Sequence, residues 1–222
     1  MYTMMTKGTV PAGTKVDMKK QLADLYKPSV KDVAVVEVPS MSFLMIDGTG
    51  NPNTSQDYRQ AVEALYRVAY ALKFLLKKEQ GIDYVVMPLE GLWWTPDMRE
   101  FSVEHKEAWL WTMMIVQPDR VTAALFERMR EQVRSKRPSP ALAELRLETF
   151  HEGLAAQIMH VGPYAAEGPT IARLHAFIHA QGYTFDAQKH HHEIYLSDPR
   201  RAAPEKMKTV IRQPITRLSE QV

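Results

Sequence analysis

Two stretches of this chain repeat the same order of expected elements, and this repeat constrains the fold more than any other feature. Each stretch reads as a strand, a glycine-containing turn, a long helix that a glycine ends, a strand, a loop and a closing strand. The closing strands end alike, in Thr112-Met-Met-Ile-Val-Gln-Pro118 and Thr209-Val-Ile-Arg-Gln-Pro214. The sequence therefore predicts an α+β fold made of two pseudo-symmetric βαββ repeats.

One long helix covers a single face of each small sheet, so each repeat alone leaves apolar surface bare. We expect the repeats to join into one antiparallel sheet, with the helices on one side and a ligand groove on the other side. Repeat one is expected at about residues 31–137 and repeat two at about 144–216, with Pro138 and Pro140 near the boundary.

Chain breakers and periodicity define the elements expected in the first repeat. A helix begins after Thr54, which forms a capping-box pattern with Asp57, and it ends at Gly81. A second helix follows from Asp119. Leu89–Arg99 contains two tryptophans, a glycine and a proline, and it reads as an aromatic loop. Strands are expected at residues 33–38, 43–46, 84–87 and 108–116.

The second repeat follows the same plan. Its helix carries Ile171, Leu174 and Ile178 on one stripe and ends at Gly182. Strands are expected at residues 145–150, 154–161, 191–196 and 207–212. Residues 1–30 are polar and interrupted by prolines, so they read as an N-terminal extension with one short helix. Residues 31–222 then form a single domain.

Charge and composition exclude several classes of function. With 28 basic and 26 acidic residues the net charge is +2, so nothing indicates a nucleic-acid partner. The absence of cysteine excludes disulfides, thiolate metal sites and a cysteine nucleophile. The N-terminus lacks the apolar stretch of a signal peptide, and no window approaches the roughly 18 apolar residues of a membrane span. We expect a soluble, cytoplasmic protein with no membrane partner.

The segment His190-His-His-Glu-Ile-Tyr-Leu196 carries the clearest candidate for chemistry. Strand alternation places His191, Glu193 and Tyr195 on one face and His192 with Ile194 on the other. We expect the aliphatic side to face the helices, which directs Glu193 and Tyr195 toward the groove. A mid-strand carboxylate among aromatic residues is costly unless it is paired or used. The alternative is a solvated sheet face.

Aromatic residues are candidates for contact with a flat ligand. Trp109 and Trp111 share one face of the strand at 108–116, where a ligand wall and an ordinary core both remain open interpretations. Trp93 and Trp94 lie in the expected loop, where they are typical of a rim or lid.

Two further carboxylates are candidates. Glu167 lies where the second repeat's helix begins, so it either complements the helix dipole or overhangs the groove. Glu90 stands beside Gly91 and the tryptophan pair.

The histidines are numerous enough to suggest a metal site, but their spacing argues against one. His190, His191 and His192 are consecutive, and consecutive strand residues point to opposite faces. His175 and His179 have helical spacing but no HExxH pattern accompanies them. No GxSxG elbow, P-loop or Rossmann fingerprint occurs. We therefore expect no metal and no cofactor.

Four segments resemble the GyrI-like small-molecule-binding proteins, and the likeness extends over roughly residues 20–215. They are Phe43–Pro52, Ala64–Lys73, Asp83–Trp94 and His192–Arg201. The chain is most similar to the stand-alone branch that includes cyclopropanoid hydrolases. The resemblance implies two βαββ repeats, a central ligand groove and a groove carboxylate at Glu193.

In that branch the implied substrates are DNA-alkylating compounds with a strained cyclopropane fused to a dienone. Glu193 and Glu167 are the candidates to assist water attack, and Tyr164, Tyr195 or Tyr66 are the candidate hydrogen-bond donors to the substrate carbonyl. The resemblance supports Glu193 best, whereas Glu167 rests on its place just after the Gly-Pro-Tyr turn. A non-catalytic module that sequesters planar or cationic drugs is the alternative, and a structural role is also open. The sequence does not determine the oligomeric state, and a homodimer is one of the open alternatives.

Overall fold

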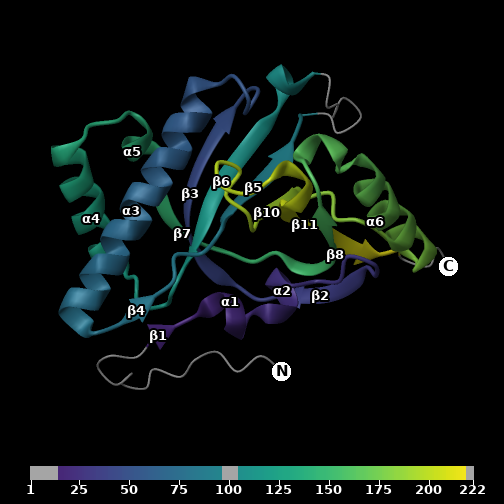
Figure 1. Ribbon diagram of the computed structural model, residues 1–222, viewed down its shortest axis with the longest axis horizontal. Helices are drawn as coiled ribbons and strands as arrows, with labels where there is room; N and C mark the ends of the chain where they lie inside the picture. Colours follow the sequence, from purple (N-terminus) through teal and green to yellow (C-terminus); the bar gives the residue numbers. More distant parts are fainter. Residues whose placement is uncertain (1–14, 97–104, 219–222) are drawn as a thin grey trace.

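The computed structural model describes residues 15–96 and 105–218. Within this part of the chain the strands form one nine-stranded sheet in the order β2-β8-β11-β10-β5-β6-β3-β7, with β9 paired to β11 (Figure 1). Its pairings are all antiparallel. The strands are β2 (Ala34–Val38), β3 (Met41–Thr49), β5 (Leu89–Trp94), β6 (Leu110–Gln117), β7 (Arg146–Phe150), β8 (Gly153–Val161), β9 (Tyr183–Phe185), β10 (His191–Tyr195) and β11 (Lys208–Arg217).

Helices of very different length connect these strands. The α-helices are α1 (Met18–Gln21), α2 (Ala23–Tyr26), α3 (Gln56–Gln80), α4 (Ala123–Lys136), α5 (Ala141–Glu144) and α6 (Gly168–Ala180). In residues 15–96 and 105–218 the short 3-10 helices are η2 (Lys106–Ala108), η3 (Tyr164–Ala166) and η4 (Pro204–Lys206). A separate parallel pair joins β1 (Lys15–Val16) to β4 (Asp83–Tyr84). Within the described residues, none of the helices is long and apolar enough to cross a bilayer.

The strand order is symmetric about the β5–β10 pair. The sequence β3-α3-β5-β6 on one side corresponds to β8-α6-β10-β11 on the other side. The strand that precedes each unit crosses to the other unit, because β2 pairs with β8 and β7 pairs with β3. The α+β class, the two βαββ repeats and the single antiparallel sheet are confirmed.

Helix α3 illustrates why these residues fold as they do. Ser55 caps its N-terminus by accepting a hydrogen bond from the backbone N–H of Tyr58, so the capping prediction at Thr54 is wrong by one residue. Gly81 ends the helix in the left-handed conformation at φ 67°, as expected. The buried face carries alanine, leucine and valine at helical spacing: Ala61, Ala64, Leu65, Val68, Ala69, Leu72 and Leu76.

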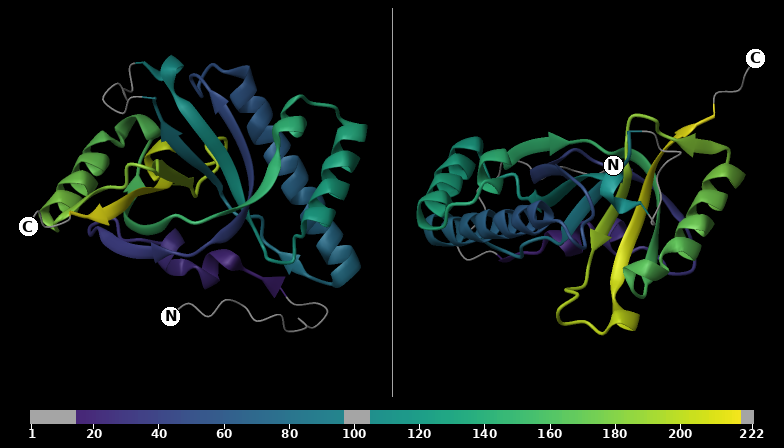
Figure 2. Two further views of the ribbon diagram at one scale, coloured as in Figure 1. Left: turned by 180° about the vertical axis from the view of Figure 1, so that it is seen from behind. Right: turned by 90° about the horizontal axis from the view of Figure 1, so that it is seen from above.

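Helices α3 and α6, which belong to the two βαββ repeats, pack on the same face of the sheet at its two ends (Figure 2). Leu174 and Ile178 of α6 pack with Ile158 and Ile211. Ile211 lies opposite Glu193, and Glu193 lies opposite Gly91, so the three residues share that face. At the other end, Tyr58 of α3 contacts the rings of Trp93 and Trp111, which are likewise register partners.

The N-terminal segment covers part of the opposite face. Leu25 and Tyr26 are 0% and 1% exposed and belong to the main core, so residues 15–30 are not the polar tail that the sequence suggested. The expected single short helix is two short helices. The rest of the predicted extension, residues 1–14, lies outside the described residues.

Residues 89–94 are a central strand, and the predicted aromatic loop is wrong there. β5 pairs with β10 on one side and β6 on the other. Of the predicted strand at 84–87, only Tyr84 lies in a strand, the two-residue β4. Residues 97–99 of the predicted loop lie outside the described part of the chain.

Candidate functional site

A cavity of about 2250 Å³ opens between α3 and α6. Its floor is the sheet face on which α3 and α6 pack, which we call the front face. Its walls come from both repeats, so the groove lies on the helix side. The prediction that the groove occupies the face opposite the helices is wrong. The reason is that α3 and α6 stand at the two ends of a wide sheet, which leaves the middle of that face uncovered. Drug-sized ligands occupy pockets of about 300–1,000 Å³, so this cavity admits a larger molecule.

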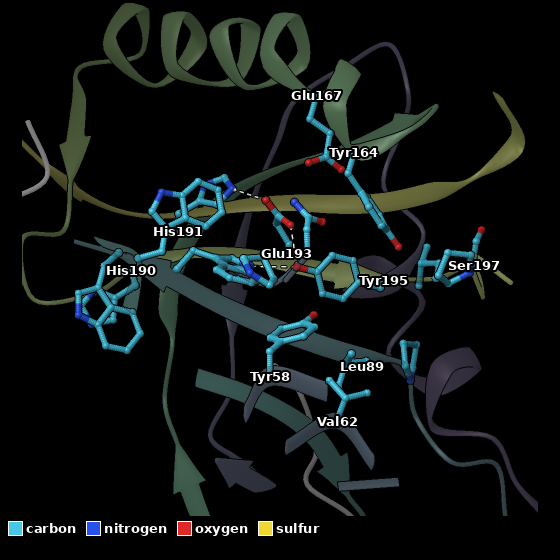
Figure 3. A pocket seen from close by; sticks show the side chains of 18 of the residues that line it. Tyr58, Val62, Leu89, Tyr164, Glu167, His190, His191, Glu193, Tyr195 and Ser197 are labelled. Atoms are coloured by element: carbon cyan, nitrogen blue, oxygen red, sulfur yellow. Dashed lines mark hydrogen bonds and ion pairs between the residues drawn. The ribbon is translucent and has the colours of Figure 1, made fainter. Parts of the chain in front are cut away.

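Glu193 projects from β10 into the middle of this cavity (Figure 3). Its Oε2 accepts a hydrogen bond from the hydroxyl of Tyr195 at 2.8 Å, and its Oε1 lies 3.3 Å from Nε2 of His191. Burial raises the pKa of Glu193, but the interactions with His191 and Tyr195 outweigh burial and bring the pKa below its ordinary value. Glu193 is therefore ionised at neutral pH, even though only 16% of its side chain is exposed to solvent.

A glycine on the neighbouring strand makes room for this arrangement. Gly91 is the register partner of Glu193, and a Cβ atom there would lie 2.8 Å from Nε1 of Trp93. The indole of Trp93 leans over the glycine and donates a hydrogen bond from Nε1 to the hydroxyl of Tyr195 at 2.9 Å. The hydrogen bonds thus run from Trp93 to Tyr195 to Glu193, which fixes the carboxylate.

Glu167 reaches the same cavity from the N-terminus of α6. It is 5% exposed, and its Oε1 is buried without a hydrogen-bond partner among the described residues. Burial and repulsion from Glu193 raise the pKa of Glu167 to about 8, although Thr209 and Lys106 act in the opposite direction. Glu167 is therefore mostly protonated at neutral pH.

The two cavity carboxyl groups thus differ in protonation state. Glu193 is an ionised hydrogen-bond acceptor, and Glu167 is a neutral acid that can donate a proton. Figure 3 shows Glu193 with Glu167 on one side and Tyr58 on the other. Carboxyl pairs whose surroundings separate their pKa values in this way are suited to divide the roles of base and acid.

Aromatic rings surround the carboxyl pair. Trp93 meets Trp109 edge-on at a centroid distance of 5.4 Å, and Tyr164 meets Tyr195 edge-on at 5.4 Å. Trp94 stacks on the imidazole of His190 at 4.1 Å. These rings give the cavity flat walls suited to a flat apolar molecule.

The cavity also extends along α3. Tyr58, Val62, Tyr66 and Tyr70 line it at every fourth position of the helix. Twelve residues of α-helix span about 18 Å, so this wall is long enough for a molecule of several fused or linked rings.

The structure brings most of the predicted site residues together in this cavity. They are Glu167, Glu193, Trp93, Trp94, Trp109, Tyr66, Tyr164 and Tyr195. Two predicted residues do not line it, and both expectations are corrected. Glu90 alternates with Gly91 and faces the other side of the sheet, fully buried. Trp111 lies in the core against Tyr58, over Gly48, where a Cβ atom would be 2.1 Å from the indole.

Three of the cavity residues that sequence reasoning missed lie around the carboxyl pair or the tryptophans. Tyr58 lies in the first turn of α3, and its spacing to Val62 and Tyr66 was a usable signal. His191 contacts Glu193; strand alternation placed the two on one face, but His191 was not chosen as a site residue. Lys106 lines the cavity with its Nζ 5.1 Å from the ring centroid of Trp109, and the sequence around it gives no signal for this position.

The three consecutive histidines have separate environments. His190 stacks on Trp94, His191 contacts Glu193, and His192 is buried on the opposite face between Glu90 and Glu152. No group of three possible metal ligands gathers anywhere in residues 15–96 and 105–218.

Comparison with known proteins gives a family match over most of the chain. Residues 31–216 match the GyrI-like small molecule binding domain. Three crystal structures from Listeria innocua are similar over the whole of their own chains. An uncharacterized conserved protein is 42% identical over 90% of this chain with a TM-score of 0.84. Two structures described as hydrolases are 40% and 41% identical over 90% and 91%, with TM-scores of 0.79 and 0.82.

A more distant structure shares the fold alone. The EcmrR C-terminal domain is 11% identical, with a TM-score of 0.52 over 84% of this chain and 98% of that domain. No curated protein matches the chain significantly.

Proposed function

Because the chain belongs to the GyrI-like family of small-molecule-binding domains, we propose that its cavity binds a flat organic molecule and hydrolyses it. The carrying observation is the carboxyl pair: Glu193 is ionised and fixed by Tyr195, whereas Glu167 is protonated in the same aromatic cavity. A binding module needs no such division between base and acid. The 40–42% identical structures from Listeria innocua, two of them described as hydrolases, support the same conclusion.

The proposed substrates are compounds with a cyclopropane fused to a dienone. Glu193 accepts a proton from a water molecule while the water oxygen bonds to the cyclopropane methylene. The bond between that methylene and the adjoining carbon of the dienone ring breaks, and its electron pair moves through the ring to the carbonyl oxygen. That oxygen becomes a phenolate and takes a proton, so the product is a phenol that has gained one water. Ring strain and aromatisation drive this step, and positioning lowers its barrier.

Donors for the carbonyl oxygen are available on the α6 side of the cavity. Glu167 carries a proton, and the hydroxyl of Tyr164 lies beside Tyr195. Burial, together with the charges of Glu167 and Glu193, raises the pKa of Tyr164 to about 12, so Tyr164 stays a donor at neutral pH. We propose that one of these groups protonates the oxygen and that Tyr195 holds Glu193.

The long wall on α3 supports an extended substrate. With the reacting ring between Glu193 and Glu167, the remainder of the molecule would lie along Val62, Tyr66 and Tyr70. Flat aromatic units fit such a wall because they bury large apolar area against rings.

A non-catalytic binder of planar cations is the second candidate, and one observation favours it. An ionised carboxylate inside an aromatic cavity attracts a flat cation through both charge and ring faces. Glu193 would then be a charge anchor. The two functions differ in turnover, because a sequestering protein protects only stoichiometrically.

The deciding experiment is a multiple-turnover incubation. The protein is mixed with a tenfold excess of a cyclopropane-containing dienone, and products are followed by mass spectrometry. The proposal expects complete conversion to a product heavier by one water. Conversion that stops at one equivalent, or no conversion with tight binding, would support the binding module.

A further inference from the structure

A second group of buried charged residues lies directly behind the candidate site, on the opposite face of the sheet. His192 stands at its centre: Nε2 lies 3.0 Å from Oε2 of Glu90, and Nδ1 lies 2.9 Å from Oε1 of Glu152. The hydroxyl of Tyr26 donates to Oε1 of Glu90 at 2.6 Å. The N-terminal segment therefore takes part in this group through Tyr26.

Arg212 of β11 completes the group. Its Nη1 donates to Oε2 of Glu152 at 2.9 Å, its Nε to Gln157 at 2.9 Å, and its Nη2 to the backbone carbonyl of Leu25 at 2.9 Å. Together Tyr26, Glu90, Glu152, His192 and Arg212 are named the back-face network. It links β5, β10, β11 and the segment before β8 to helix α2.

The network is sealed from solvent. The side chains of His192, Glu90, Glu152 and Arg212 are all 0–2% exposed. Burial lowers the pKa of His192, but Glu152 and Glu90 outweigh burial and raise it to about 9. Burial raises the pKa of Glu152, but His192 and Arg212 outweigh it and bring it to about 2. The imidazolium of His192 and the guanidinium of Arg212 therefore flank the ionised carboxylate of Glu152 at neutral pH.

Its place in the sheet connects it to the cavity. β5 and β10 are the strands where the two repeats meet at the centre of the sheet. The His192–Glu90 contact crosses that junction on the back face, while the Trp93–Tyr195–Glu193 hydrogen bonds cross it on the front face. His192 is the chain neighbour of both His191 and Glu193. A shift of β10 relative to β5 would therefore move Glu193 and Tyr195 away from Trp93.

We propose that the back-face network is a positioning device, in which His192, Glu90 and Tyr26 fix β10 against β5 and thereby hold Glu193 against Trp93 and Tyr195. The N-terminal segment is then part of the working site, although it contacts only the far side of the sheet. Buried ion pairs rarely stabilise a fold better than apolar residues of the same volume would, so their best-supported use is to specify one geometry.

The matched experiment compares two buried tyrosines. Tyr26→Phe removes the hydroxyl that binds Glu90 and leaves the ring in place. Tyr84→Phe removes a buried hydroxyl near Ala69 and Gln117, away from β10, and serves as the control. Replacement of His192 itself would leave two buried carboxylates facing an empty position and risks unfolding, so Tyr26→Phe is the decisive variant.

The first readout needs no substrate, so it is independent of the proposed hydrolysis. The Trp93 indole N–H is followed by NMR in protein labelled at its tryptophans, with Trp93→Phe used for assignment. The proposal expects this resonance to shift in Tyr26→Phe and to stay in place in Tyr84→Phe, because its acceptor is Tyr195. Equal behaviour of the resonance in both variants would overturn the positioning role, whatever the activity.

The second readout rests on the proposed function. With a hydrolysed substrate, Tyr26→Phe is expected to lower kcat about 2- to 30-fold, the range seen for residues that act on a site through a packed network. KM should change less, because no ligand contact is lost. If Tyr26→Phe and Tyr84→Phe have the same kcat, the network is structural and the proposal is wrong.

Discussion

The hydroxyl of Tyr195 donates to Oε2 of Glu193 over 2.8 Å, and both side chains project from the same face of β10, two residues apart. This places a stabilised carboxylate at the centre of the cavity. The same hydroxyl accepts a hydrogen bond from Trp93 of β5, so residues from both repeats determine where the carboxylate lies. The cavity is therefore a joint product of the two repeats.

The Trp93–Tyr195 hydrogen bond can be removed without removing the aromatic wall. Trp93→Phe keeps a ring in the cavity but deletes the indole N–H. One hydrogen bond contributes about 0.5–1.5 kcal/mol net, so we expect turnover to fall roughly 2- to 13-fold. Ligand affinity should change little, and stopped-flow turnover beside equilibrium binding measures both. A loss of affinity equal to the loss of rate would show that the indole acts as a ligand contact instead.

Glu167 should make stability depend on pH. Its folded pKa is about 8 against 4.5 for the ordinary group, so the unfolded chain loses this proton first as pH rises. The cost of burying the group is absent below pH 4.5, grows between 4.5 and 8, and is complete above 8. Glu167→Gln removes the ionisable group and should therefore stabilise the protein most at alkaline pH.

Thermal unfolding of wild type and Glu167→Gln at pH 5 and pH 9 measures this effect. One pKa unit corresponds to about 1.4 kcal/mol, and 1 kcal/mol shifts Tm by roughly 2–4 °C in a chain of this size. We expect the variant to gain at least several degrees at pH 9 and much less at pH 5. A Tm difference that is the same at both pH values would mean that Glu167 is ionised throughout.

Strand alternation at residues 191–195 correctly predicted the direction of Glu193, but for a mistaken reason. The prediction assigned Ile194 to the helix side, whereas Ile194 faces away from α3 and α6. The face that carries Ile194 is covered in part by the N-terminal segment, where Leu25 and Tyr26 are buried although their sequence neighbours are polar. The helices α1 and α2 have four residues each, which is too short for a helical repeat of apolar residues to be recognised. The packing of this segment on the sheet could therefore not be predicted from the sequence.

The tryptophan residues show a second limit of sequence reasoning. Gly91 and Pro96 favour a loop by local preference, yet Gly91 lies in a central strand because the Trp93 indole occupies the place of its missing side chain. Tertiary contact overrides local preference here. Likewise, alternation correctly grouped Trp111 with the cavity face, but only the packing of Tyr58 above it shows that the ring is covered.

The N-terminal segment should contribute measurably to stability. Leu25→Ala removes a fully buried side chain, and such changes cost about 2–5 kcal/mol of the free energy of unfolding. Val30→Ala in the same segment is the control, because Val30 is 49% exposed and should change stability by less than about 0.5 kcal/mol. Urea unfolding compares the two. Equal stability of both variants would mean that the segment does not pack on the sheet in solution.

Catalysis by Glu193 is tested most directly by Glu193→Gln. The amide keeps the size and hydrogen bonding of the side chain but cannot accept the proton of water. Loss of a general base costs on the order of 100- to 10,000-fold in rate. Turnover of a cyclopropane-containing dienone is measured by mass spectrometry, and binding by quenching of tryptophan fluorescence. We predict a variant that binds the neutral ligand nearly as well as wild type but hydrolyses it at least 100-fold more slowly. Hydrolysis by Glu193→Gln at a rate near that of wild type would contradict this role for Glu193.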